Sequence, residues 1–142
     1  MSADEDLELL DRPPTAIEHR ELFDAVGWGD HMTDHERDVS LRASVVGVIA
    51  RSRGQTVGMA RVLGDGIHYF GVHDVVVHPD RQGEQIAERL LERLIQLVTE
   101  RAGARARLEL FASDEAVELY RGFGFTERGP LGMSRAVHLG VR

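Results

Sequence analysis

Residues 72–98, VHDVVVHPDRQGEQIAERLLERLIQLV, decide the fold. The run Val72–Val77 is rich in β-branched residues, which suits a buried strand. Pro79 ends this strand, because proline has no N–H to donate to a sheet ladder. A helical pattern begins at Gln82. Its apolar side chains, which recur with a period of 3.6 residues, are Ile86, Ala87, Leu90, Leu91, Leu94, Ile95 and Val98.

The turn between strand and helix, Arg81–Gly83, is a candidate anion site. A turn that opens a helix leaves backbone N–H groups unpaired at the positive end of the helix dipole. Such a place binds phosphate. Many α/β proteins contain the same connection without a ligand. The pattern alone therefore leaves two interpretations open, a phosphate site and an ordinary strand–turn–helix connection.

The same stretch resembles the acetyl-CoA motif of the GNAT superfamily of N-acetyltransferases. In that motif a strand ending in V-x-P leads to R/Q-x-x-G-x-G/A at a helix start. The matching positions hold Gln82, Gly83, Glu84, Gln85, Ile86 and Ala87. Gln85 departs from the motif, because the family usually has glycine there, where the backbone approaches the pyrophosphate.

Residues 114–125, DEAVELYRGFGF, resemble a second motif of the same family. The family pattern is A-x-x-L-Y-x-x-x-G-F. Its positions are occupied by Ala116, Leu119, Tyr120, Gly124 and Phe125. The two motifs stand in the family's order and spacing, and the resemblance covers about residues 15–138.

The fold that this resemblance implies is α/β (α+β), with a central mixed, mostly antiparallel sheet, helices on both faces and splayed parallel central strands. We expect a single N-acetyltransferase domain over residues 1–142, with residues 1–6 disordered. In chain order the patterning predicts a strand at 7–10, helices at 15–27 and 34–44, strands at 45–51 and 55–63, a strand at 67–77 with an interruption at Gly71, a helix from 82, a strand at 106–112, a helix at 114–121 and closing strands at 125–128 and 133–139.

Composition narrows the classes of function. The 142 residues carry a net charge of −7, which disfavours nonspecific nucleic-acid binding and suits a cationic substrate such as an amine. There is no cysteine, so disulfides, thiolate metal sites and a cysteine nucleophile are excluded. No apolar run approaches the roughly 18 residues that span a membrane, and the acidic N-terminus is unlike a signal peptide. We expect a cytoplasmic protein that binds neither membrane nor nucleic acid.

Two histidines, His31 and His35, stand four residues apart and could share one helix face as metal ligands. No third ligand lies near them in the sequence. Solvated surface histidines are the favoured interpretation, and we predict that the protein holds no metal.

The resemblance also implies an activity, the acetyl-CoA-dependent transfer of an acetyl group directly to a primary amine of a small molecule or a protein. The turn at residues 82–87 would hold the pyrophosphate. The pantetheine arm would pair with the open strand edge at Val75, Val76 and Val77, where a backbone N–H would polarise the thioester carbonyl. Ser113 stands where the family often has a cofactor-contacting asparagine, and serine is shorter.

Tyr120 is the candidate general acid, since it aligns with a tyrosine that lies near the thioester sulfur in many family members. A phenol stays protonated at neutral pH and can donate to a thiolate. A packing role for Tyr120 is the alternative. The general base is left open among His73 and Asp74 on the strand, with Glu109 as a third candidate.

The acceptor side is less defined. Residues 23–28, FDAVGW, resemble a first-helix segment of small bacterial members, where this region helps to form the acceptor pocket, so Phe23 and Trp28 are candidate substrate contacts. A core position is the alternative for both. The departures at Gln85 and Ser113 are the argument for a second class of function, a non-catalytic member of the fold that binds CoA weakly or not at all and acts through a partner. Tyr120 and most of the phosphate turn are present, and they favour the enzyme. The acceptor, the acyl chain length and a homodimer stay open.

Overall fold

The structure is a computed structural model that describes residues 6–29, 31–127 and 129–138. The chain forms two compact units, Met1–Leu110 and Phe111–Arg142, and each is described by itself. Residues 1–5 of the predicted disordered N-terminus lie outside the described residues, whereas Asp6 is ion-paired to Arg53 (2.9 Å). The expectation of a single domain stays a prediction.

The first unit contains a five-stranded sheet in the order β1-β2-β3-β4-β5. Its elements are β1 (Leu7–Leu10), α1 (Ala16–Ala25), α2 (Asp34–Arg42), β2 (Val46–Ser52), β3 (Gln55–Gly64), β4 (Tyr69–Val77), the short 3-10 helix η2 (Pro79–Arg81), α3 (Ile86–Arg101) and β5 (Arg107–Glu109). Neighbouring strands are antiparallel except β4 and β5, which are parallel because α3 crosses between them. The predicted mixed, mostly antiparallel sheet is confirmed.

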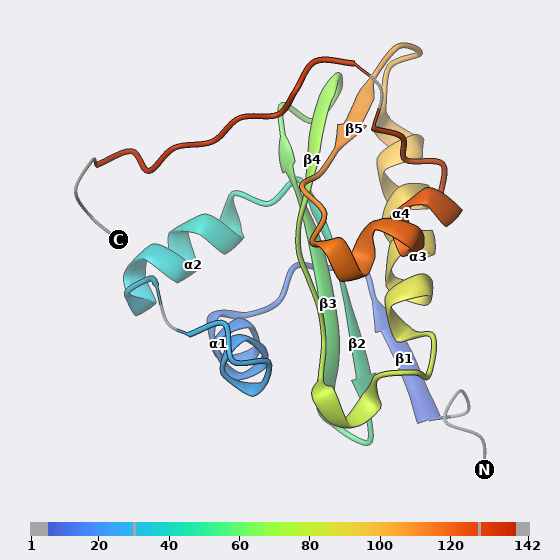
Figure 1. Cartoon of the computed structure of the whole chain (residues 1–142). Helices are drawn as coiled ribbons and strands as arrows, with labels where there is room; N and C mark the ends of the chain where they lie inside the picture. The colour runs from blue at the N-terminus through green and yellow to red at the C-terminus, as the bar shows by residue number, and fades with distance from the viewer. Residues whose placement is uncertain (1–5, 30, 128, 139–142) are drawn as a thin grey trace. The chain divides into compact units, whose positions relative to one another are not determined.

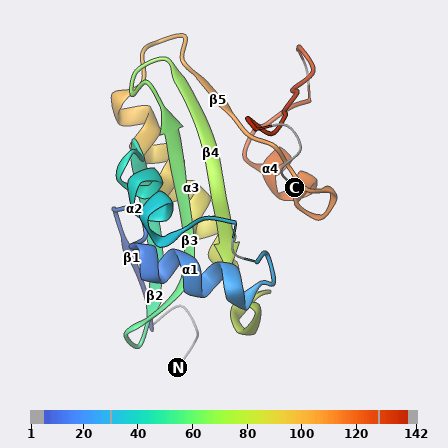
Figure 2. The same cartoon turned by 90° about the vertical axis from the view of Figure 1, so that its left-hand side faces the viewer.

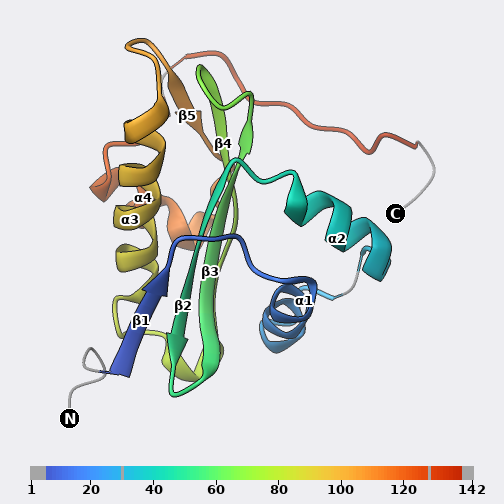
Figure 3. The same ribbon diagram turned by 180° about the vertical axis from the view of Figure 1, so that it is seen from behind.

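Helices cover both faces of this sheet, as predicted. Helix α3 lies on one face, and α1 and α2 lie on the other (Figures 1 and 2). The core beneath α1 consists of Leu22, Phe23, Ile49, Met59 and Val76. The view from behind shows β1 at the outer edge of the sheet beside β2 (Figure 3).

Close packing of α3 depends on a glycine in β3. A Cβ on Gly58 would stand 3.0 Å from Leu90 and 3.1 Å from Ile86, both buried side chains of α3. The bare backbone at Gly58 therefore lets the first turns of α3 lie directly on the sheet. This contact fixes the start of α3 relative to the end of β4, because Gly58 also pairs with Val77, the last residue of β4.

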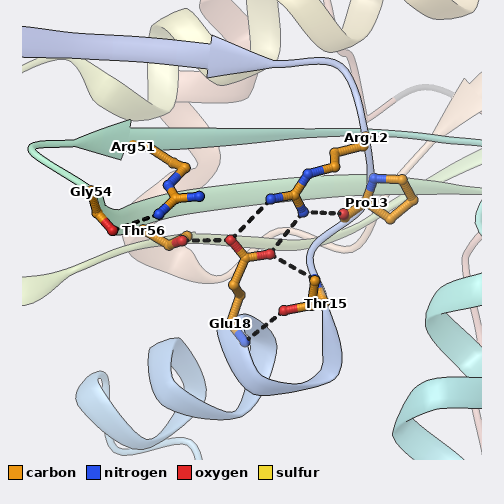
Figure 4. Close-up of polar contacts among 7 residues, drawn as sticks. All are labelled: Arg12, Pro13, Thr15, Glu18, Arg51, Gly54 and Thr56. Carbon is orange, nitrogen blue, oxygen red and sulfur yellow. Dashed lines mark hydrogen bonds and ion pairs between the residues drawn. The ribbon is translucent and has the colours of Figure 1, made fainter.

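Helix α1 is tied to the sheet through its first turn (Figure 4). Thr15 and Glu18 form a capping box at the start of the predicted helix. The Glu18 carboxylate also accepts hydrogen bonds from Arg12 (2.8 Å) and from the Thr56 hydroxyl in β3 (2.7 Å). Burial alone would raise the pKa of Glu18, but these donors outweigh it and lower the pKa to about 2. The helix start is therefore held by a carboxylate that stays ionised.

Three sequence predictions need correction in the first unit. Strand β4 runs through Gly71 without interruption, and its irregularity lies at Asp74 instead. Helix α3 begins at Ile86 rather than at residue 82, because Gly83 and Gln85 both have a left-handed backbone that a helix cannot contain. Strand β5 covers only Arg107–Glu109, a shorter run than 106–112.

The second unit contains η3 (Asp114–Ala116) and α4 (Val117–Gly122), which confirms the predicted helix. The predicted closing strands are wrong for the described residues 125–127 and 129–138, which form no ladder. Leu131, Met133 and Val137 alternate as in a strand, yet all are more than 80% exposed. Alternation of apolar residues alone therefore does not show that this segment pairs with another strand. Within the described part of the chain, no helix is long and apolar enough to cross a membrane.

Candidate functional site

The parallel pair β4 and β5 separates soon after it forms. Only Tyr69, Phe70 and Gly71 of β4 pair with β5, whose last partner is Glu109. Among the described residues, no strand pairs with Val72–Val77 on the edge that faces away from β3. This is the predicted splay, and it leaves a row of backbone N–H and C=O groups able to pair with an extended ligand.

A β-bulge lies on this open stretch. In the β3–β4 ladder, Arg61 pairs with His73 and Met59 pairs with Val76, so β4 holds one more residue than β3 between these pairs. Asp74 takes up the extra length with a φ of 55°. A left-handed backbone costs a non-glycine residue ~1–2 kcal/mol. Some interaction must offset this cost.

The side chain of Asp74 supplies that interaction. Its Oδ2 accepts a hydrogen bond from Arg61 Nε (2.7 Å) and lies 3.1 Å from His19 Nε2. Burial alone would raise the pKa of Asp74. The hydrogen bonds from His19 and Arg61, together with the arginine charge, outweigh burial and hold the pKa below its usual value of 3.8. The carboxylate is therefore ionised and engaged.

One more buried side chain, that of Arg37, extends this cluster. Arg37 Nε donates to His19 Nδ1 (3.2 Å), and both residues are 0% exposed. Arg61 donates to the Ser40 carbonyl (3.0 Å) and to the Ser44 hydroxyl (3.2 Å). The sequence pattern did not identify His19, Arg37 or Arg61 as residues of the site. The signal was available, since Arg61 interrupts an apolar strand and His19 precedes Leu22 and Phe23 on the apolar face of α1.

The other two candidate bases lie on one face of the sheet. His73 pairs with Arg61, whose side chain reaches α2, so the register places His73 on the face that α1 and α2 cover. Gly71 lies two residues earlier on that face, and Glu109 is its partner in β5. His73 and Glu109 are both exposed. The structure therefore brings them to the same face, at the point where β4 and β5 part.

The predicted phosphate turn follows β4. Gln82, Gly83 and Gln85 are exposed, and Glu84 is half-buried. The first backbone N–H of α3 that donates to a carbonyl one turn back belongs to Arg89, which bonds Gln85 (3.2 Å). The N–H groups of Ile86 and Ala87 precede it, at the end of the helix where such groups lack helical partners. The start of α3 therefore offers backbone donors next to an exposed turn, which fits a phosphate.

Gln85 has a left-handed backbone, with φ 61° and ψ 26°, immediately before α3. Its side chain makes no capping hydrogen bond. This geometry explains why glycine is usual at the matching motif position, since glycine adopts a positive φ without strain. Nearby, Arg81 Nε donates to both carboxylate oxygens of Glu84 (3.0 and 2.9 Å), so the charge that Glu84 brings to the turn is paired.

The two aromatic candidates on the acceptor side differ in burial. Phe23 is 8% exposed and belongs to the core beneath α1. Trp28 is 48% exposed, and its ring meets that of Phe23 edge-on with a centroid distance of 5.2 Å. Phe23 therefore holds Trp28 in place, while Trp28 offers surface that a substrate can contact.

The remaining candidates lie in the second unit. Tyr120 is largely buried in α4, its ring packs edge-on against Phe125 at 5.9 Å, and burial raises its pKa above the usual 10.0. The phenol therefore keeps its proton at neutral pH. Ser113 precedes η3, and its side chain makes no capping hydrogen bond. In the described ranges, no cluster of three or more His, Asp or Glu side chains is arranged to hold a metal ion.

The known proteins that this chain resembles are named as acetyltransferases. A family profile described as the acetyltransferase (GNAT) domain matches residues 30–138. The histone acetyltransferase TAP1 of Glycine max is 36% identical over 77 residues, which cover 54% of this chain and 32% of that protein. The uncharacterized N-acetyltransferase ycf52 of Porphyra purpurea is 30% identical over 112 residues, which cover 76% of this chain and 63% of that protein.

Solved structures agree on the fold. A probable acetyltransferase of unknown function from meticillin-resistant Staphylococcus aureus superposes with a TM-score of 0.79 at 22% identity, covering 91% of this chain and 99% of that chain. At this identity the likeness shows the fold. The chain spans about a third of the soybean relative and less than two thirds of the algal one.

Proposed function

This chain belongs to the GNAT family of acetyltransferases, and on that premise we propose that it transfers an acetyl group from acetyl-CoA directly to a primary amine. One observation carries the proposal. Strand β4 has an open edge over Val72–Val77, and that edge leads through an exposed turn to the first backbone N–H groups of α3. An extended amide-bearing arm that ends in phosphates matches both features.

Donor binding divides between the two features. Val75, Val76 and Val77 offer main-chain groups to the pantetheine amides, and one of their N–H groups polarises the thioester carbonyl. The pyrophosphate binds at the turn formed by Gln82, Gly83, Glu84, Gln85, Ile86 and Ala87. Ser113 is a further candidate contact, shorter than the asparagine often found at the matching position.

The reaction requires two proton transfers. The amine nitrogen attacks the thioester carbon, the new C–N bond forms, and the C–S bond breaks as the thiolate leaves. We assign removal of the amine proton to His73, because an imidazole can accept a proton at neutral pH and this one is exposed. Glu109 on the same sheet face is the alternative base. The Tyr120 phenol is the candidate donor to the thiolate.

The acceptor is proposed only by class, as a small molecule or a protein that carries a primary amine. The net charge of −7 suits a cationic acceptor, and Trp28 is the exposed aromatic surface on that side. A cytoplasmic location and the absence of a metal, of nucleic acid and of membrane among its partners stay predictions. A non-catalytic member that acts through a partner is the second candidate, which the strained Gln85 favours.

The amino-acid composition of the chain removes two sources of background signal from an activity assay. The sequence contains neither cysteine nor lysine. A thiol reagent therefore reports only the CoA that is released, and any acetyl-lysine found by mass spectrometry comes from an added protein acceptor. We expect acetyl-CoA to bind in calorimetry and thiol release to depend on an added amine. Binding without amine-dependent release from a broad panel of polyamines, aminosugars and basic peptides would favour the non-catalytic candidate.

Tyr120→Phe tests the acid. Loss of general-acid help typically lowers turnover by ~10²- to 10⁴-fold, whereas the affinity for acetyl-CoA should stay nearly the same because the hydroxyl acts on the leaving sulfur. Tyr69→Phe is the matched control, since Tyr69 is the other tyrosine of the chain and is 62% exposed. Equal turnover in wild type and Tyr120→Phe would show that water or another group protonates the thiolate.

A further inference from the structure

We propose that the buried cluster formed by His19, Arg37, Arg61 and Asp74, hereafter the bulge cluster, is a positioning device that holds the β4 bulge in the shape that receives the thioester carbonyl. The inference rests on the proposed function, since it concerns the same open edge. It assigns roles to His19, Arg37 and Arg61, and it makes Asp74 a positioning residue rather than the base.

The bulge creates a stretch of backbone without strand partners on either side. Asp74 and Val75 have no register partner on β3, because the ladder passes from the His73 pair to the Val76 pair. Pairing with β5 has already ended at Gly71. Buried or half-buried N–H groups require a partner. In this part of the described sheet, a ligand carbonyl can supply one.

The shape of that stretch is set by side chains from four elements. Asp74 in β4 is bonded to Arg61 in β3 and to His19 in α1. Arg61 is fixed in turn by α2, since its Nη2 bonds the Ser40 hydroxyl (3.0 Å) and its Nη1 bonds the Ser40 carbonyl (3.0 Å). Moving Asp74 would break its bonds to His19 in α1 and to Arg61 in β3 at once. The left-handed backbone is therefore held from outside β4.

The protonation state of His19 follows from its two partners. An arginine Nε can only donate, so His19 Nδ1 must accept from Arg37 and carries no proton. The proton lies on Nε2, which donates to the Asp74 carboxylate. Arg37 thus fixes the tautomer of His19, and His19 presents Asp74 with an N–H in a constant direction. The cation Arg37 also lies 3.5 Å from Asp34.

Asp74 is a poor base for the same reasons. Its Oδ2 accepts from an arginine and a histidine, and only 17% of its side chain is exposed. A proton taken up by this carboxylate would weaken both bonds. His73, the residue before it, is exposed and carries no such bonds among the described interactions. The bulge thus engages one polar side chain in hydrogen bonds that hold the backbone and leaves its neighbour exposed.

The test compares His19→Leu, which removes both ring nitrogens, with His19→Gln, whose amide N–H can still reach Asp74. Two readouts are measured: the HN–Hα coupling of Asp74 in the unliganded protein by NMR, and the ratio of the dissociation constants of CoA and acetyl-CoA by calorimetry. We expect His19→Leu to lose the left-handed coupling and to lower the preference for acetyl-CoA about tenfold, the size of one hydrogen bond. His19→Gln should keep both within about twofold.

His68→Leu is the matched control, because His68 lies in the same unit and contacts Tyr69 rather than the cluster. It should behave as wild type. If His19→Leu does not fold, Ser40→Ala takes its place, since it removes only the hydroxyl bonded to Arg61, and a two- to threefold smaller ratio is expected, roughly part of one hydrogen bond. A folded variant with unchanged coupling and ratio overturns the proposal. Failure of wild type to bind acetyl-CoA would refute the proposed function, while the ligand-free coupling still decides the role of the cluster.

Discussion

Asp74 and Gln85 share a backbone conformation that few non-glycine residues adopt, yet they are held in opposite ways. Asp74 has a φ of 55° and Gln85 a φ of 61°. The first lies in the bulge of β4 and is bonded by its side chain to Arg61 and His19. The second precedes α3, is exposed, and makes no capping bond. Both positions border the proposed donor site.

This difference shows two ways to keep a strained residue. A strained backbone persists when the surrounding structure over-determines it. At Asp74 the side chain is itself the restraint, so the residue type is essential. At Gln85 the restraint comes from the neighbours, because α3 is fixed on the sheet through Gly58 and the turn must join it to β4. The side chain at position 85 is then incidental to the fold.

The largest predicted contrast is in stability. Asp74→Ala leaves the cationic Arg61 buried without its carboxylate, and breaking a buried pair in this way costs ~3–5 kcal/mol. Gln85→Ala should change the free energy of unfolding by less than ~0.5 kcal/mol, as is usual for an exposed side chain. Urea unfolding followed by the fluorescence of Trp28, the only tryptophan, measures both. Equal losses at the two positions would refute the distinction.

The second contrast between the two positions is in how the free energy of unfolding depends on pH. Asp74 has a lowered pKa and Glu18 a pKa of about 2, so each stabilises the fold above its unfolded pKa and loses that contribution as the pH falls through its folded value. We expect stability to fall between about pH 4.5 and 2. Asp74→Asn and Glu18→Gln should each flatten this fall, at a cost of ~1.5–3 kcal/mol at neutral pH. Gln85→Gly should leave the slope unchanged, and a flatter slope in that variant would contradict the assignment.

Much of the first unit was predictable because its signals are local. Thr15 and Glu18 have the spacing of a capping box, which marks the start of α1. The short gap between the predicted strands 45–51 and 55–63 indicates a hairpin, and Arg53 and Gly54 in that gap have the positive φ values of a tight turn (52° and 79°). The motif also located the open edge and the turn before α3. Each of these depends on residues close together in the sequence.

The bulge and its cluster were not predictable in the same way. Gly71 was expected to interrupt β4, whereas the irregularity falls at Asp74, which needs partners from α1 and β3 that are far away in the chain. A polar residue on an apolar face, such as His19, indicates a buried hydrogen bond but does not identify its partner. The pattern at residues 133–139 likewise indicated a strand without identifying the sheet edge that it would pair with.

The smallest predicted effect is the most direct test of the comparison, because it makes one substitution at both places. Gln85→Gly should tighten acetyl-CoA binding about tenfold, or ~1.4 kcal/mol, since glycine removes a Cβ and a long side chain beside the proposed pyrophosphate. Its effect on stability should lie between about 0 and 1.6 kcal/mol, because relief of ~1–2 kcal/mol of left-handed strain is offset by the ~0.4–1 kcal/mol that glycine's freedom adds to the unfolded chain.

Asp74→Gly relieves the same strain and should nevertheless weaken the preference for acetyl-CoA over CoA, because the carboxylate that anchors the bulge to Arg61 and His19 is gone. Titrations of both variants under one salt condition compare them, since phosphate affinities depend on salt. Glycine should therefore help at position 85 and harm at position 74. If Gln85→Gly binds acetyl-CoA no better than wild type, the glutamine is accommodated by the turn, and the non-catalytic candidate loses the observation that favours it.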